Sequence, residues 1–298
     1  MIARTYPTPE AFRQALEQRL RTAARTQSAD IARLRQVLVF DRFLTRIFQE
    51  LGDRVVAKGG VVLELRLDRA RTTRDVDIRM VGPSTDLLAR LKNAGALRLD
   101  DHLTFDVALD RRHPTLDGDG LAYEGQRFRV EAALAGKIYG SSFGLDVGFG
   151  DVMTVPPELI DGSDLLAFAG VERTRHRVYS RESHIAEKLH AYTMPRPRVN
   201  SRVKDLPDLA LLATTGSFEG ARLRAALEAT FHFRKTHSLP LSVPAPPESW
   251  AATYARMAND DGLPWKSIDT LLDAVRGFLD PILMHPHGTW DPEIWLWS

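Results

Sequence analysis

The sequence contains no cysteine among its 298 residues. It therefore has no disulfide, no thiolate nucleophile and no cysteine-ligated zinc. Its hydrophobic runs all fall well short of the roughly 18 residues that suggest a membrane-spanning helix. The first residues, 1–7, lack the apolar core of a signal peptide. We therefore expect a cytoplasmic protein that makes no contact with a membrane.

An excess of charge of either sign is also missing. The 40 Lys and Arg residues nearly balance the 39 Asp and Glu residues, which leaves a formal net charge of +1. This balance gives no global attraction to nucleic acid, so any polyanion must be bound by a local basic surface. The sequence also lacks a G-x-x-x-x-G-K-[ST] loop and a G-x-S-x-G elbow, which disfavours a P-loop NTPase and an α/β-hydrolase.

The patterning divides the chain into a mixed α and β part and a helical part, which predicts an α+β protein with domains at 1–163 and 164–298. In the first part, Thr8 and Ser28 are each placed to cap a helix. A short helix is expected at 61–67. Strands are expected at 75–80, 103–109, 127–134 and 145–149.

Helical spacing dominates the second part. Helices are expected at 182–193, 206–215, 219–233, 250–259 and 267–279. The tail, 281–298, holds Trp290, Trp295 and Trp297. Because exposed tryptophans are unfavourable, we expect this tail to pack on the body of the protein.

The most informative motif joins a glycine turn to a pair of carboxylates. Lys58, Gly59 and Gly60 precede a short apolar stretch, and Asp75 and Asp77 follow it in an expected strand. Alternate residues of a strand face the same side, so the two carboxylates share a face with Cα atoms roughly 6–7 Å apart. Such a pair suits one or two Mg²⁺ ions, and glycines let backbone N–H groups approach phosphate oxygens. Each part of the motif also has a simpler interpretation. The glycine pair could be an ordinary turn between two elements, and the carboxylate pair could lie on an exposed strand.

A third carboxylate lies in an apolar strand. Asp146 follows Leu145 and precedes Val147, where a buried charge is unfavourable unless it is paired or bound to a metal. It is a candidate metal ligand, or a general base for an attacking hydroxyl. Asp106 competes for this role, and we prefer Asp146. The simpler interpretation is a solvated acid on an edge strand.

The helical part contributes a lysine and a polar motif. Lys188 lies at the margin of an apolar helix face, where its side chain can reach a phosphate or extend into solvent. Pro207 favours a helix start, with Asp205 as N-cap and Asp208 as the third helical residue. The motif is either a cap or a site at which Asp208 orients Lys188 or the nucleotide.

The order of these motifs resembles the AbiEii/AbiGii family of nucleotidyltransferase toxins, within the DNA polymerase β-like superfamily. The resemblance covers about residues 57–212. It implies a polymerase β-like mixed sheet with helices, followed by a helical C-terminal lobe. It also implies that Asp75 and Asp77 hold Mg²⁺, that Lys188 binds the triphosphate, and that Asp208 is the essential acid of the last motif.

The same resemblance implies an activity and partners. Similar toxins transfer nucleotides from an NTP to the 3′ acceptor end of tRNA, which blocks aminoacylation and translation, and a cognate antitoxin neutralises them. The expected catalytic residues are Asp75, Asp77, Asp146, Lys188 and Asp208. The expected nucleotide-binding residues are Lys58, Gly59, Gly60, Lys188, Arg202 and Lys204, and the expected metal ligands are Asp75, Asp77 and Asp146. The expected RNA-binding residues are Arg71, Arg74, Arg202 and Lys204.

Two alternatives stay open at this point. The acceptor could be a protein or a small molecule, or the chain could be an inactive fold that only binds RNA or a partner. Two departures from the superfamily pattern also matter. Gly60 stands where many members have serine, although Gly-Gly is usual in this branch, and Pro207 replaces a larger helical residue.

Overall fold

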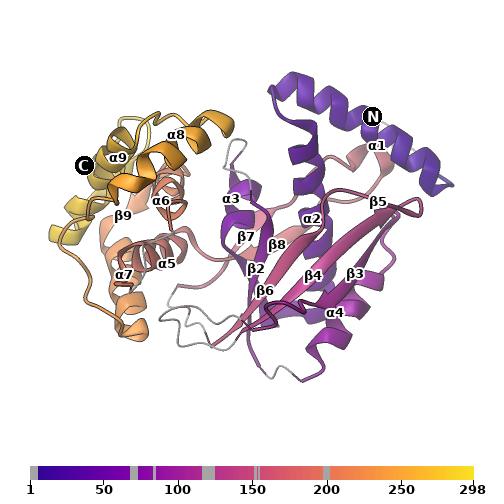
Figure 1. Ribbon diagram of the computed structural model, residues 1–298, viewed down its shortest axis with the longest axis horizontal. Helices are drawn as coiled ribbons and strands as arrows, with labels where there is room; N and C mark the ends of the chain where they lie inside the picture. The colour runs from indigo at the N-terminus through magenta and orange to yellow at the C-terminus, as the bar shows by residue number, and fades with distance from the viewer. Residues whose placement is uncertain are drawn as a thin grey trace.

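The computed structural model describes residues 6–67, 73–82, 85–115, 125–150, 153, 155–196 and 202–298. The described chain forms two lobes side by side, a sheet lobe from the N-terminal half and a helical lobe from the C-terminal half (Figure 1). Arg71, one of the expected RNA-binding residues, lies outside the described residues. Among the described helices, none combines the length and the hydrophobicity that crossing a bilayer requires.

A mixed sheet forms the first lobe. Its strand order is β3-β4-β6-β2-β1-β8-β7, with β5 paired to β4. The β2–β6 and β1–β8 pairs are parallel, and the others are antiparallel. The strands are β1 (Val55–Lys58), β2 (Asp75–Met80), β3 (Leu103–Leu109), β4 (Gly125–Leu134), β5 (Lys137–Ile138), β6 (Phe143–Phe149), β7 (Glu158–Asp161) and β8 (Arg175–Val178).

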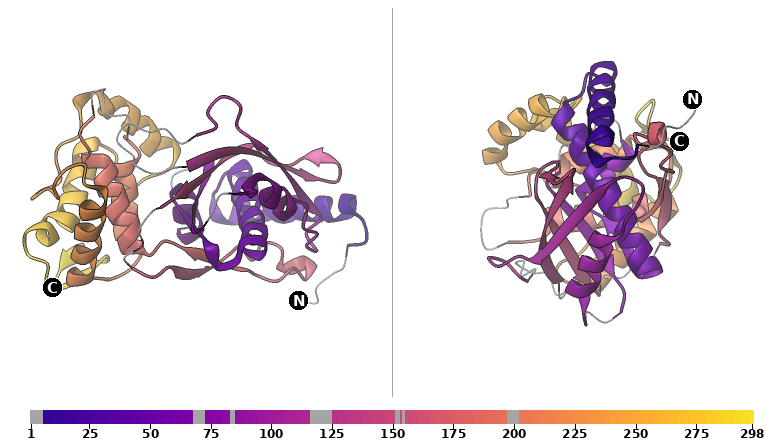
Figure 2. Two further views of the ribbon diagram at one scale, coloured as in Figure 1. Left: turned by 90° about the horizontal axis from the view of Figure 1, so that it is seen from below. Right: turned by 90° about the vertical axis from the view of Figure 1, so that its right-hand side faces the viewer.

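Helices cover one face of this sheet, which curves around them (Figure 2). They are α1 (Pro9–Gln27), α2 (Ile31–Leu51), α3 (Gly60–Arg66) and α4 (Leu87–Ala96), with short 3-10 helices at Gly52–Arg54 and Ala167–Ala169. Phe40 and Phe43 of α2 pack edge-on against Phe143 of β6, and all three are buried. Strands β2, β3 and β6 alternate buried and accessible residues. The accessible positions leave polar side chains on the opposite face.

The second lobe is helical, with one small sheet. Its helices are α5 (Arg181–Thr193), α6 (Asp205–Ala213), α7 (Gly220–Arg234), α8 (Ala251–Asp260) and α9 (Ile268–Met284), with a 3-10 helix at Glu248–Trp250. The strands β9 (Phe218–Glu219), β10 (Thr289–Asp291) and β11 (Leu296–Trp297) pair in the order β11-β10-β9. A second hydrophobic core, which includes Ile185, Leu209 and Phe278, lies within this lobe.

The fold agrees with the predicted α+β class, and most predicted elements are confirmed within a few residues. Thr8 caps α1 as expected, accepting from the Ala11 amide at 3.2 Å. The prediction for Ser28 is wrong. Ser28 ends α1 in a left-handed conformation at φ 51°, and Asp30 caps α2 by accepting from the Arg33 amide at 2.8 Å. The carboxylate two residues later takes over the capping role that serine also fills.

The sheet lobe continues past residue 163, the end of the predicted first domain. Strands β7 and β8 were not predicted, yet β8 pairs in parallel with β1 at Ala57 and Val178. Phe168 and Val178 belong to the first core, whereas Ile185 belongs to the second. The division at 163 stays a prediction, and these cores lead us to propose a division between Val178 and Ile185 instead.

The tryptophan tail packs on the helical lobe, as the sequence predicts. The Trp290 side chain is fully buried, and its indole N–H donates to the Ala213 carbonyl at 2.9 Å. The indoles of Trp295 and Trp297 donate to the carbonyls of Ala274 and Phe278 in α9, at 3.0 and 2.8 Å. These hydrogen bonds attach the end of the chain to the last helix, and the strands β10 and β11 were not predicted.

We predict that Trp290→Ala lowers the free energy of unfolding by about 3–5 kcal/mol, because it opens a cavity in a full core and leaves the Ala213 carbonyl unpaired. Ile294→Ala is the matched control. The Ile294 side chain is 64% exposed, so its loss should change stability by less than about 0.5 kcal/mol. Urea unfolding measures both values, and equal effects of the two substitutions would contradict this account of the tail.

Candidate active site

The carboxylate pair lies on one face of β2, as the alternation predicts. Val76, Ile78 and Met80 are buried in the core, whereas Asp75 is exposed and Asp77 is half-buried on the opposite face. The parallel register with β6 sets Asp75 beside Gly144 and Asp77 beside Asp146. The site is therefore built by strand pairing between residues that lie far apart in the sequence.

Two glycines make room for this pair. A Cβ atom at Gly59 would lie 2.1 Å from Asp77 Oδ2, and one at Gly144 would lie 2.6 Å from Asp75 Oδ1. Gly59 also has φ +70°, which side chains rarely adopt. Larger residues would displace the carboxylates. The turn residues Lys58–Gly60 thus lie directly against Asp77, as the motif suggests, although their contact with phosphate stays a prediction.

The third carboxylate, Asp146, is next to Asp77 in register but is already paired. Arg127 of β4, opposite Asp146 in the antiparallel register, donates Nε to Oδ1 and Nη2 to Oδ2, each at 2.6 Å. Asp106 lies further away on β3, opposite Glu131 and separated from β6 by β4. The structure therefore brings Asp146, and not Asp106, to the carboxylate pair.

Sequence reasoning did not identify Arg127. An arginine in a strand-like segment does not by itself indicate a functional role. The partner of Arg127 is determined only by the pairing of β4 with β6. In the structure it satisfies both oxygens of Asp146 in a bidentate pair, which is a strong arrangement for a carboxylate. Asp146 contacts any further group only if Arg127 yields an oxygen.

Lys188 of α5 is held at the edge of the second lobe by two buried acids. Its Nζ donates to Asp205 Oδ1 at 2.9 Å and lies 2.7 Å from Asp208 Oδ2. Both acids come from the first turn of α6 and are nearly inaccessible. Asp208 therefore contacts Lys188, which fits the hypothesis that Asp208 orients it.

The predicted helix start at Asp205 is wrong by one residue. Lys204 is the N-cap, Asp205 is the first helical residue, and Asp208 is the fourth. Pro207 lies in the first turn, as expected, where it disrupts no intrahelical hydrogen bond. The acid side chains accept from Lys188 rather than completing the predicted capping arrangement.

The remaining predicted cations lie at the rim. Arg202 Nη1 is 3.8 Å from Asp205 Oδ2, Lys204 is exposed at the start of α6, and Arg74 is exposed immediately before Asp75. Lys58 Nζ lies over the Tyr179 ring, 5.9 Å from its centroid. Whether these cations hold nucleotide or RNA stays a prediction.

The electrostatics of Asp77 link both lobes. Burial, together with the neighbouring charge of Asp146, raises the pKa of Asp77 to about 6, while Lys58 and Lys188 act in the opposite direction. Lys188 belongs to α5, so a cation of the helical lobe acts on a carboxylate of the sheet. The patch concentrates negative charge that a bound cation would relieve.

The donor set at this patch fits a hard divalent cation, which prefers oxygen ligands. Asp75 and Asp77 face the same side, and each lies against a glycine, Gly144 for Asp75 and Gly59 for Asp77. Within the part of the chain that the structure describes, no three Asp, Glu or His side chains already form a metal-binding group. Arg127 pairs with both oxygens of Asp146, and the role of Asp75 and Asp77 as metal ligands stays a prediction.

Comparison with known proteins identifies the class. A family model for the nucleotidyl transferase AbiEii toxin of type IV toxin–antitoxin systems matches residues 42–274. This is more than half of the chain, which therefore belongs to the AbiEii family of nucleotidyltransferase toxins. The resemblance drawn from the sequence motifs is confirmed.

A solved structure of a toxin shares the fold. MenT4, a nucleotidyltransferase toxin from Mycobacterium tuberculosis H37Rv, superposes with a TM-score of 0.53 at 17% identity, covering 77% of this chain and 78% of that one. JHP933 from Helicobacter pylori superposes more loosely, with a TM-score of 0.42 at 16% identity, covering 82% of this chain and 94% of that one. No curated protein sequence matches the chain.

We predict that Asp77→Asn stabilises the fold without metal at pH 8, by up to about 3 kcal/mol. A carboxyl with a raised pKa destabilises the folded state while it is charged, and this effect fades as the pH falls through about 6. The stability difference between the variant and the wild type should therefore shrink between pH 8 and pH 5. Urea unfolding in EDTA at both pH values measures it, and a variant less stable than wild type at pH 8 would show that burial of the charged carboxylate does not destabilise the fold.

A second prediction concerns Gly59→Ala, with Gly136→Ala as matched control. Both glycines have left-handed φ, +70° and +67°, but a Cβ at Gly136 meets no atom within 4 Å. Both variants should lose about 1 kcal/mol from backbone strain. Only Gly59→Ala should also displace the Asp77 carboxylate and abolish nucleotide transfer. Full transfer by a folded Gly59→Ala protein would show that the close approach of Gly59 to Asp77 is unimportant.

Proposed function

We propose that this toxin is a Mg²⁺-dependent enzyme that transfers nucleotides from an NTP to the 3′ acceptor end of tRNA, so that aminoacylation and translation stop. The observation that carries the proposal is the β2–β6 register, which sets Asp75 and Asp77 on one face beside Asp146. The acceptor is inferred from the resemblance to toxins of this family. An antitoxin partner follows from membership of a toxin–antitoxin family.

Asp75 and Asp77 would hold the metal. When bound, Mg²⁺ places positive charge beside the triphosphate oxygens and the pyrophosphate that leaves. One or two ions fit the proposal equally well. Asp146 is the candidate third ligand, available once Arg127 releases one of its oxygens.

Lys188 would neutralise the triphosphate from the opposite lobe. Two charge-assisted contacts, to Asp205 and Asp208, fix its position, and only 14% of its side chain is exposed. The turn Lys58–Gly60 would contact the same phosphates. Lys58 would supply a positive charge, and the glycines would let backbone N–H groups approach the phosphate oxygens. Positioning by such preset charges is the main protein contribution to phosphoryl-type transfer.

Asp146 would accept the proton of the attacking 3′-hydroxyl. This role needs one free oxygen, because a carboxylate held on both oxygens by a guanidinium is a weak base. Arg127 would then be free to contact a phosphate of the acceptor. The Arg127 side chain is 37% exposed, so it can move without disturbing the core.

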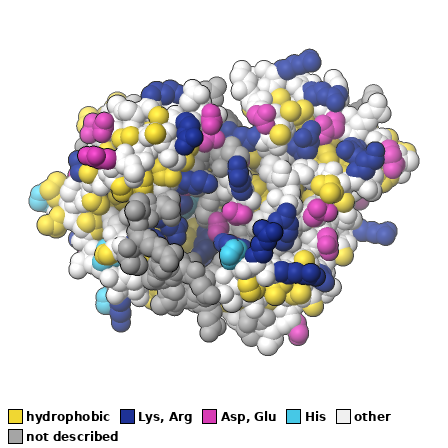
Figure 3. All heavy atoms as spheres, viewed as in Figure 1, with side chains coloured by type: hydrophobic (Ala, Val, Ile, Leu, Met, Phe, Trp, Pro, Cys, Tyr) yellow, Lys and Arg dark blue, Asp and Glu magenta, His cyan; other side chains and the backbone are white. Residues whose placement is uncertain are grey.

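The acceptor RNA would bind along the boundary between the lobes. Lys and Arg side chains gather in the hollow that separates them (Figure 3). Arg74, Arg202 and Lys204 are the described candidates for its backbone contacts, and Arg71 is a fourth from the sequence alone. Binding through phosphates should weaken steeply with salt. Arg202 and Lys204 are also candidates for contact with the NTP.

Two other functions would use some of the same residues. The enzyme could modify a protein or a small molecule, or the chain could bind RNA or a partner without catalysis. The assembled carboxylates and Lys188 favour an enzyme over the last alternative, because carboxylates brought so close together repel each other and such arrangements concentrate at functional sites.

The test is incubation of the protein with total tRNA, Mg²⁺ and each labelled NTP in turn, with Asp77→Ala as control. We expect label on tRNA with one or two of the NTPs, and a loss of at least about 100-fold with the variant. Thermal unfolding should show that the variant is folded. Retained transfer by folded Asp77→Ala would refute the role of this carboxylate.

The destination of the label decides between the alternatives. Label on polypeptide would make a protein the acceptor. NTP binding without any label would indicate a small-molecule acceptor, and absence of NTP binding would indicate a binding-only protein.

A further inference from the structure

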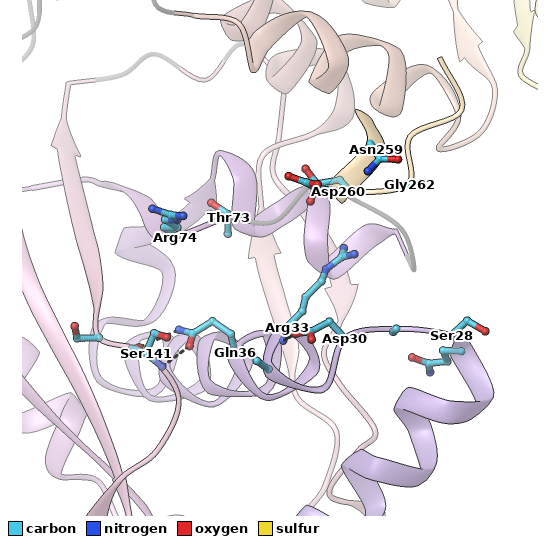
Figure 4. A pocket seen from close by; sticks show the side chains of 15 residues that line it. Ser28, Asp30, Arg33, Gln36, Thr73, Arg74, Ser141, Asn259, Asp260 and Gly262 are labelled. Carbon is cyan, nitrogen blue, oxygen red and sulfur yellow. Dashed lines mark hydrogen bonds between the residues drawn. The ribbon is translucent and has the colours of Figure 1, made fainter. Parts of the chain in front are cut away.

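A cavity of about 750 Å³ lies between the two lobes (Figure 4). One wall is the corner between α1 and α2, at residues 27–36. A second wall is formed by Thr73 and Arg74 before β2, with Ser141 and Ser142 before β6. The end of α8, at residues 259–262, closes it from the helical lobe.

This cavity lies at the ends of β2 and β6 that precede Asp75 and Gly144, and Asp75 and Asp77 are not among its lining residues. Arg74 directly precedes Asp75, and Ser142 directly precedes β6, in which Gly144 is paired with Asp75. Lys58 lies on β1, which flanks β2 on its other side. A transfer reaction brings two reactants to one centre, so the acceptor must approach from a side that the triphosphate leaves open.

The chemistry of the lining suits a nucleoside rather than a phosphate group. Among the described residues that line it, neutral hydrogen-bonding side chains and three carboxylates accompany two arginines, so these residues carry no excess of positive charge. Part of the wall is preorganised. The Gln36 amide donates to the Ser141 carbonyl at 3.2 Å and accepts from the Ser141 amide at 2.8 Å. A volume of this size matches ordinary small-molecule sites.

We propose that this cavity binds the terminal nucleoside of the RNA acceptor, with its ribose 3′-hydroxyl directed toward Asp75 and its base between α2 and α8. The inference rests on the proposed function, since it assigns the acceptor of that reaction. The corner at residues 27–36 precedes the family-matched region, 42–274. The inferred site therefore draws on α1 and the start of α2, which lie outside the matched residues.

The test fills the cavity from two sides. Ala32 is exposed on α2 and Asn259 is exposed near the end of α8, so tryptophan at either position occupies the cavity without entering a core. Ala225→Trp, at an exposed position of α7 outside the cavity, is the matched control. Transfer is measured over a range of acceptor concentration and, separately, of NTP concentration.

We expect Ala32→Trp and Asn259→Trp each to raise the KM for acceptor RNA by about tenfold or more, because stacking and hydrogen bonds to one base are lost. The KM for NTP and all values for Ala225→Trp should stay unchanged. Unchanged acceptor KM in both cavity variants would overturn the proposal. A rise in the KM for NTP instead would assign the cavity to the nucleotide donor, which would also overturn it.

A binding experiment separates this inference from the proposed function. Fluorescence anisotropy measures the affinity of a labelled single-stranded RNA, with an unmodified 3′ end, for the wild type and the three variants. If the wild type transfers no nucleotide but Ala32→Trp and Asn259→Trp still weaken RNA binding, the cavity site stands and the proposed function falls. If transfer occurs and RNA affinity and KM are both unaffected, the proposed function stands and the cavity site falls.

Discussion

The cost of burying the Asp77 charge, increased by repulsion from neighbouring carboxylates, is the constraint on which the candidate site depends. The β2–β6 register crowds Asp75, Asp77 and Asp146 onto one face of the sheet, where like charges oppose each other and burial opposes charge altogether. Cations from several elements offset this repulsion: Arg127 on β4 pairs with Asp146, while Lys58 and Lys188 act on Asp77. The pKa of Asp77 nevertheless stays raised, and the proposed metal ion would stabilise its charged form.

The same balance links the helical lobe to the proposed active site. Lys188 reaches the sheet only because α5 carries it to the boundary and α6 holds it through Asp205 and Asp208. Each of these acids would be unfavourable in its buried position without the lysine. The helical lobe also lines the cavity at the starts of β2 and β6 through residues 259–262. The sheet lobe therefore supplies the carboxylates and the helical lobe supplies Lys188. The two substrates would meet in the space between the lobes.

Local pattern predicted much of the fold and named most of the residues that the structure gathers at the candidate site. The alternation of Asp75–Met80 indicated both the strand and the face of its carboxylates, and the family resemblance supplied the order of the parts. The features that the sequence pattern did not predict are set by pairing between strands far apart in the chain. Strand β8 is too short to show a pattern of its own, and Arg127 gains its partner only when β4 pairs with β6. The Ser28 cap failed because Asp30 competes for the same role two residues later. The strand and arginine outcomes depend on tertiary contacts that spacing does not encode, whereas the cap was decided by local competition.

Binding of Mn²⁺ in the presence of a non-hydrolysable NTP analogue tests the central claim most directly, because it reports the site without requiring the correct acceptor. Electron paramagnetic resonance can measure it for the wild type, for Asp75→Asn and Asp77→Asn, and for Asp106→Asn as a control on the same face of the sheet. The account predicts a loss of affinity of at least about tenfold in the first two variants and none in the third. Equal Mn²⁺ affinity in all four proteins would contradict it, because the carboxylate pair would then have no part in holding the metal.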